Sequence, residues 1–132
     1  MSAEDVEIVR RVNAVTSEGD FGAAFQFFDP AIEWVVARQH PNARTLKGHK
    51  ALAEYQREWQ EMLPDVHVQY DRVLDAGIKV IAIGTVRGTG SGSGIDVRVP
   101  IAFLITVRDG LISGVEEYLD RAEPLKATGL QG

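Results

Sequence analysis

Cysteine is missing from all 132 residues of the chain. Its absence excludes disulfide bonds, thiol nucleophiles and thiolate metal sites together. Any chemistry must therefore use oxygen, imidazole or water. The three histidines are His40, His49 and His67, and none is spaced with a second ligand in a pattern typical of a metal site. We therefore expect neither a metal nor an organic cofactor.

Long apolar runs and a basic face are also missing. No stretch of 18 apolar residues suggests a membrane span, and the N-terminal residues MSAEDVEIVRR are acidic and helical where a signal peptide would be basic and then apolar. The formal net charge is -5, with lysine and arginine scattered along the chain. Nucleic acids and membranes are therefore not expected partners. We expect a cytoplasmic protein.

The composition that is present suits a globular α+β protein. With 45% hydrophobic and 25% charged residues, residues 1–132 predict one domain with one core. Apolar residues recur at helical spacing in the first half, and capping or proline residues bound each segment. The predicted helices run from Ser2 to about Ser17, from Asp20 to Asp29-Pro30, and from Gly48 to Pro64. A short strand, Ile32 to Ala37, and a polar loop, Arg38 to Lys47, lie between the last two.

From Asp65 onward the apolar residues alternate with a period of two, which predicts strands. The predicted strands are Val66 to Leu74, Lys79 to Arg87, Ile95 to Val107 and Leu111 to Asp120. Turn residues separate consecutive strands, so the pattern indicates hairpins and a strongly curved antiparallel sheet. The fold class predicted is therefore α+β, with the sheet packed against three N-terminal helices.

Two of these strands indicate that both sheet faces are covered. Val80 to Val86 and Val99 to Val107 are apolar in both phases, which a sheet with one wet face does not need. Helices can cover only one face. We therefore predict a homodimer formed through the outer sheet face. The alternative is that a peptide, or a C-terminal helix within Arg121 to Leu130, folds over that face.

Glu117 is the most unusual residue of the last strand. At a two-residue period it shares the apolar side with Leu111, Val115 and Leu119. A carboxylate removed from water without a partner costs several kcal/mol, so it must be paired, protonated or in a wet cavity. Glu117 is thus a candidate acid or base, a candidate ligand contact, or one half of a structural ion pair.

Other candidate site residues follow from their positions. Arg98 and Ala102 are predicted on the cavity side of their strand, where Arg98 is the candidate ion-pair partner of Glu117. His40, in the polar loop, is either a general base or hydrogen-bond donor at a pocket mouth or a solvent-facing side chain. The other three candidates, which form an aromatic pocket wall or ordinary core, are Trp34, Tyr55 and Trp59.

The order of elements and several short motifs resemble the SnoaL-like branch of the nuclear transport factor 2-like superfamily. The motifs are Gly19-Asp20-Phe21, Asp29-Pro30-Ala31-Ile32-Glu33-Trp34, Lys47-Gly48-His49, Asp109-Gly110 and Glu117-Tyr118-Leu119-Asp120 followed by Leu125 to Leu130. This resemblance covers nearly the whole chain and implies a cone-shaped barrel with an internal pocket. Members of this family include ketosteroid isomerases, polyketide cyclases and epoxide hydrolases, so the resemblance implies a pocket and no single reaction.

The residues expected for two of these activities are incomplete. For a ketosteroid isomerase, the tyrosine, base and acid positions fall at Val12, at Trp34 or Val35, and at Ala102. For an epoxide hydrolase, Glu117 matches one of the aspartates, while Gly84 to Val86 stand where its partners belong and Arg87 lies nearby.

Two functional classes remain open. The first is a cofactor-independent isomerase, lyase, cyclase or hydrolase that acts on an apolar ring-bearing substrate, with Glu117 as acid or base. The second is a non-catalytic module that binds a hydrophobic ligand or dimerises.

Overall fold

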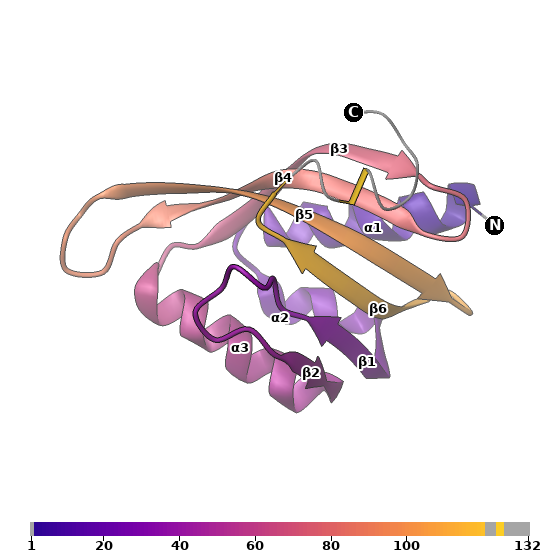
Figure 1. The fold of residues 1–132 in the computed structure, drawn as a ribbon, viewed down its shortest axis with the longest axis horizontal. Helices are drawn as coiled ribbons and strands as arrows, with labels where there is room; N and C mark the ends of the chain where they lie inside the picture. Colours follow the sequence, from indigo (N-terminus) through magenta and orange to yellow (C-terminus); the bar gives the residue numbers. More distant parts are fainter. Residues whose placement is uncertain (1, 121–123, 126–132) are drawn as a thin grey trace.

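The computed structural model describes residues 2–120 and 124–125 and contains helices packed on a six-stranded sheet (Figure 1). The α+β prediction is confirmed. In chain order the elements are α1 (Ser2–Thr16), α2 (Phe21–Ala24), the 3-10 turn η1 (Phe25–Phe27), β1 (Phe28–Val35), β2 (Thr45–Lys47), α3 (Gly48–Met62), β3 (His67–Asp75), β4 (Val80–Thr89), β5 (Asp96–Arg108) and β6 (Leu111–Tyr118).

The second predicted helix begins at its predicted capping residue. The Asp20 carboxylate accepts a hydrogen bond from the backbone N–H of Ala23 at 3.2 Å, as an N-cap does. The second helix is shorter than predicted, however, because η1 follows it and strand β1 already begins at Phe28 rather than at Ile32. Pairing of Phe28 with Ile112 of β6 outweighs the local helical pattern there.

The sheet is mixed, which corrects the expectation of a purely antiparallel one. Its strand order is β2-β1-β6-β5-β4-β3, and β1 runs parallel to β6 whereas all other neighbours are antiparallel. The hairpin turns determine the direction of β3 to β6, but no turn joins β1 to β6. The polar loop also holds a strand that was missed, because Thr45–Lys47 pairs with Glu33–Val35 as β2.

The helices lie on one side of the sheet and divide that side between them (Figure 1). Helix α1 packs against β3 and β4, and α3 packs against β1 and β2 at the other end. The main core forms between these layers and includes Val9, Leu52, Ile32, Phe103 and Val115. The helix-covered face of the sheet is therefore where an internal cavity can form.

The outer face of the sheet is partly covered by the chain itself. Ile81, Ile83, Ala102 and Leu104 form a second apolar cluster there, and Leu125 packs into it with only 7% of its surface exposed. The reason for expecting a dimer, an uncovered apolar face, therefore applies only in part, and the homodimer stays a prediction. Most of the predicted C-terminal helix lies outside the described residues.

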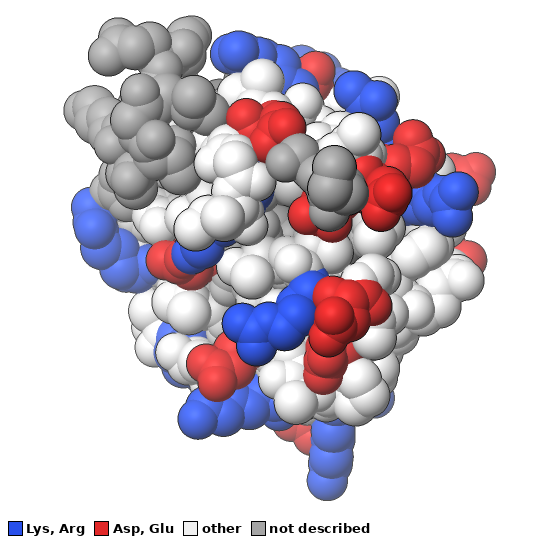
Figure 2. Space-filling view, turned by 90° about the vertical axis from the view of Figure 1, so that its right-hand side faces the viewer, with Lys and Arg blue, Asp and Glu red and all other residues white. Residues whose placement is uncertain are grey.

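Charge on the protein surface is mixed. On the face drawn in Figure 2, acidic and basic side chains are interspersed, without a continuous basic area. Among the described residues, no helix is long and apolar enough to cross a membrane. The cytoplasmic location stays a prediction.

The close approach of strands β3 and β4 explains why position 84 is occupied by glycine. Gly84 of β4 lies beside an irregularity in β3 between Tyr70 and Arg72. A Cβ at this position would overlap the carbonyl oxygen of Gln69 and lie 2.9 Å from the Cα of Tyr70. Both obstacles are backbone atoms of a paired strand, so they cannot move without disturbing the pairing.

We predict that Gly84→Ala lowers the free energy of unfolding by about 2–4 kcal/mol, because the added methyl group separates β3 from β4. Urea unfolding measures the change. Gly22→Ala is the matched control, since its Cβ would meet only the Asp20 carboxylate, at 3.8 Å, within a helix. Equal stability of the two variants would contradict the prediction.

Candidate functional site

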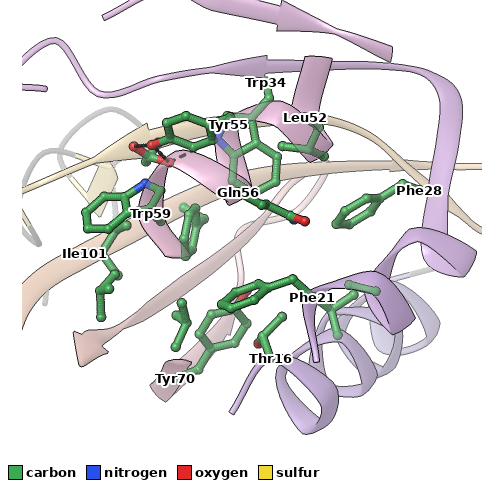
Figure 3. A pocket seen from close by; sticks show the side chains of 16 residues that line it. Thr16, Phe21, Phe28, Trp34, Leu52, Tyr55, Gln56, Trp59, Tyr70 and Ile101 are labelled. Carbon is green, nitrogen blue, oxygen red and sulfur yellow. Dashed lines mark hydrogen bonds between the residues drawn. The ribbon is translucent and has the colours of Figure 1, made fainter. Parts of the chain in front are cut away.

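An apolar cavity lies between the helices and the inner face of the sheet (Figure 3). Its volume is about 70 Å³. Seven aromatic side chains form most of its wall: Phe21, Phe28, Trp34, Tyr55, Trp59, Tyr70 and Phe103. Pockets for drug-sized ligands measure roughly 300–1,000 Å³, so this cavity holds a small molecule or one end of a larger one.

Three polar side chains interrupt the apolar wall. They are Thr16 of α1, Gln56 of α3 and Glu117 of β6. Glu117 is only 4% exposed, and it is the only carboxylate in the cavity wall among the described residues. An acid surrounded by aromatic rings is therefore the main chemical feature of this site.

Glu117 is held by hydrogen-bond donors from two other parts of the fold. The Tyr55 hydroxyl of α3 donates to both carboxylate oxygens, at 2.7 Å to Oε1 and 3.0 Å to Oε2. The indole N–H of Trp34 in β1 donates to Oε2 at 3.0 Å, and the backbone N–H of Ala37 donates to Oε1 at 3.4 Å. Glu117 is thus fully hydrogen-bonded without an ion-pair partner at salt-bridge distance among the described residues.

Burial has the largest effect on the pKa of the Glu117 carboxyl. Loss of water raises the pKa of Glu117 above its ordinary value, although the bonds from Tyr55, Trp34 and Ala37 and the nearby His40 oppose the rise. The pKa of Tyr55 is also raised, mainly by burial and next by the adjacent Glu117. The pair therefore favours a form in which Tyr55 keeps its proton and donates to Glu117.

His40 lies at the edge of the site rather than in the cavity wall. Its ring stands 5.8 Å from that of Tyr55 and 6.0 Å from that of Trp59, measured between centroids. Its Nδ1 accepts a hydrogen bond from the backbone N–H of Asn42 at 3.0 Å, so the ring proton of neutral His40 is on Nε2. The structure thus brings together Glu117, Trp34, Tyr55 and Trp59, with His40 beside them.

Arg98 does not lie in the cavity, which corrects the ion-pair hypothesis. Its side chain is 63% exposed and pairs with Asp96 at 3.3 Å. Ala102 is fully buried, but in the outer cluster with Ile81 and Leu104. The inner face of β5 instead presents Ile101 and Phe103 to the cavity.

A bulge in β6 explains why the sequence pattern predicted the wrong face of β5 to line the cavity. The tight turn pairs Arg108 with Leu111, and uninterrupted pairing from there would place Ala102 opposite Glu117. The register shifts between Thr106 and Val107, so that Phe103 pairs with Glu117 and Ala102 with Tyr118. One extra residue in a strand moves every later side chain to the other face.

Gln56 and Phe103 are site residues that were missed. In Figure 3 the Gln56 side chain points into the cavity from α3. Gln56 lies four residues after Leu52 and three before Trp59, so it is a polar residue on the apolar stripe of a helix, a detectable signal. The position of Phe103 in the cavity wall depends on the bulge in β6, and no local feature of the sequence indicates that bulge.

No group of three or more potential metal-ligating side chains occurs within residues 2–120 and 124–125. His49 instead contacts the carbonyl oxygen of Phe28 at 3.1 Å, and His67 contacts that of Asp65 at 3.1 Å. These two imidazoles therefore stabilise local structure.

We predict that the contribution of Glu117 to the stability of the protein falls as pH rises. Its folded pKa lies above the ordinary 4.5, so the folded state keeps a proton that the unfolded chain releases, and stability decreases as pH rises from 4.5 through the folded pKa. Glu117→Gln cannot ionise.

The free energy of unfolding of the wild type minus that of Glu117→Gln should therefore decrease over this range, by at most about 1.4 kcal/mol per pH unit. Urea unfolding from pH 4 to 8 measures it. Glu116→Gln, on the other face of the same strand, controls for loss of a carboxylate, and a difference that grows with pH would contradict the prediction.

We also predict that Tyr55→Phe raises the pKa of Glu117 further. The Tyr55 hydroxyl is the strongest of the contacts that lower this pKa, and phenylalanine keeps the ring while removing the donor. Titration of the Glu117 carboxyl carbon by ¹³C NMR measures the change. An unchanged or lower pKa would show that the hydroxyl does not stabilise the carboxylate.

Several solved structures share this fold. An NTF2-like protein from Burkholderia thailandensis E264 is 26% identical, with a TM-score of 0.78, over 93% of this chain and 95% of that chain. A hypothetical protein with a ketosteroid isomerase-like fold from Catenulispora acidiphila DSM 44928, in complex with trimethylamine, is 23% identical, with a TM-score of 0.73, over 95% and 94%. A proposed SnoaL-like polyketide cyclase from Jannaschia sp. CCS1 is 18% identical, with a TM-score of 0.75, over 98% and 94%.

No curated protein matches the chain. The model of the SnoaL-like domain matches residues 9–115, which include the second half of α1, the aromatic wall and most of the sheet. The expected resemblance is thereby confirmed, and the chain belongs to the SnoaL-like domain family.

Proposed function

We propose that the cavity binds one end of a small apolar, ring-bearing molecule and that Glu117 transfers a proton to or from it. The observation that carries this proposal is a buried carboxyl with a raised pKa in the wall of an aromatic cavity. A carboxyl group shifted toward neutral pH exchanges its proton readily under physiological conditions. The reaction class is then a cofactor-independent isomerisation, cyclisation or hydrolysis.

The neighbours of Glu117 support a role in proton transfer. Tyr55 donates to either carboxylate oxygen, so it can follow the charge as the proton leaves or returns. The aromatic wall excludes water, which strengthens electrostatic interactions with a bound molecule. In this proposal Glu117 is the acid or base, while Tyr55 and Trp34 orient it.

The ketosteroid isomerase mechanism is not supported by this cavity wall. Val12 occupies the position expected for the isomerase tyrosine and lines the cavity as an apolar residue. Ala102, at the position of the isomerase acid, faces the outer cluster. A reaction that needs only one carboxyl group suits the described wall better.

A second candidate function is binding without chemistry, with a small amine as ligand. An ionised Glu117 among aromatic faces would attract an organic cation, both by its charge and through cation–π contacts. The structure of the Catenulispora acidiphila protein in complex with trimethylamine favours this alternative.

A thermal-shift screen of the wild type and Glu117→Gln tests the proposed function. The panel comprises steroids, terpenoid epoxides, aromatic polyketides, fatty acids and trimethylamine. At about ten times the Kd, a ligand stabilises the folded state by about 1.4 kcal/mol and raises the Tm by about 4 °C. We expect a neutral ring-bearing hit, changed by Glu117→Gln and unaffected by Glu116→Gln.

Turnover of the hit would then separate catalysis from binding. Glu117→Gln should lower kcat by about a hundredfold or more if Glu117 transfers the proton. A hit that is bound by the wild type but left unchanged favours the binding module. A response to trimethylamine alone, growing as Glu117 ionises, favours the amine alternative, and hits that are indifferent to Glu117→Gln contradict both.

A further inference from the structure

A surface groove of about 430 Å³ lies beside the narrow cavity. Pro41, Met62, Val99 and Leu119 supply its apolar lining, and Met62 is 50% exposed. An exposed methionine over an apolar surface suits a ligand contact, because its unbranched side chain adapts to different shapes.

Trp59 lies between the two spaces. Among the described residues it is the only side chain that lines both the cavity and the groove. Its indole contacts Tyr55 closely enough to lower the pKa of that hydroxyl, and the ring of His40 packs 6.0 Å from its own ring. On its groove side, the ring of Trp59 therefore lies beside a loop residue, His40.

Trp59 is also placed where it can move. It stands in the last turn of α3, which ends at Met62, and its side chain is only half-buried. Rotation of the indole about its own side-chain bonds would join the two spaces without breaking any strand pairing. Such a rotation would exchange the hydrogen-bond contact of Trp59 with the Tyr55 hydroxyl, but it would leave the bond from Trp34 to Glu117 in place.

We propose that the groove is the second subsite for the ligand of Glu117, and that Trp59 is the movable wall between the two. This inference rests on the proposed function. The ligand is then an elongated apolar molecule that places a small hydrogen-bonding head at Glu117 and a ring-sized body in the groove. The volume of the cavity alone leaves no space for that body.

The charges at the groove further restrict the ligand. Glu58 and Glu61 line its edge. Arg44 neutralises Glu58 at 2.8 Å, while no ion pair of Glu61 is found among the described residues. The body that lies in the groove is therefore neutral or cationic, and an anionic tail is disfavoured.

Two phenols distinguish the subsites. Phenol carries one ring and a hydroxyl head, whereas 4-phenylphenol adds a second ring along the same axis. The chain contains only two tryptophans, so protein labelled with 5-fluorotryptophan gives two ¹⁹F NMR signals, one from Trp34 and one from Trp59. Trp59→Phe and Trp34→Phe assign them.

We expect both probes to shift the Trp34 signal, and 4-phenylphenol to shift the Trp59 signal more than phenol does, because Trp59 lines both the cavity and the groove. Met62→Ala should weaken the Kd for 4-phenylphenol about fivefold and leave that for phenol unchanged, because only the longer probe reaches the groove. Ile78→Ala is the control, since Ile78 is an exposed hydrophobic residue in the turn between β3 and β4. Titration calorimetry measures both constants.

The outcomes separate this inference from the proposed function. If phenol binding depends on Glu117 but 4-phenylphenol does not bind, or binds without moving the Trp59 signal more than phenol does, the groove proposal is wrong and the proposed function stands. If 4-phenylphenol binding depends on Met62 and moves Trp59 but ignores Glu117→Gln, the groove proposal stands and the proposed function is wrong.

Discussion

The hydrogen-bonded carboxyl of Glu117 is the interaction that joins the parts of this fold around the cavity. Glu117 belongs to β6, and its donors come from α3, from β1 and from the residues just after β1. Each of these donors would be an unsatisfied polar group in an apolar interior without it, at a cost of about 1–3 kcal/mol each. The carboxyl therefore closes the cavity at one end. Burial also keeps the pKa of this carboxyl raised.

The shape around Glu117 depends on irregular strands. The bulge in β6 turns Phe103 toward Glu117 and Ala102 away from it, and the irregularity in β3 lies against Gly84. Bulges increase the local twist and bend of a sheet, and a bent sheet leaves space between itself and the helices. The same departures from regular pairing that are hard to recognise in a sequence thus create the space in which a ligand can lie.

Features set by local patterns were predictable from the sequence. The period of apolar residues indicated α3 and the four later strands within a few residues, and the carboxylate on an apolar strand face indicated Glu117. Features set by distant pairing were not. The parallel contact of β1 with β6, the short strand β2 and the placement of Arg98 and Ala102 all depend on segments far apart in sequence or on a single inserted residue. No turn or period within a segment carries that information.

The narrow cavity and the raised pKa of Glu117 have the same cause. Trp59 and its aromatic neighbours exclude water, and the lost hydration makes the charged carboxylate less favourable. If Trp59 moved aside in the free protein, water would enter and the pKa of Glu117 would fall toward its ordinary value. In the proposed arrangement, a ligand body that replaces the indole must therefore also replace its shielding if the pKa of Glu117 is to stay raised. A hydrophilic body would occupy the same space but let the pKa of Glu117 fall toward its ordinary value. The proposed preference for an apolar ligand and the raised pKa of Glu117 would thus depend on one physical condition, the exclusion of water at Trp59.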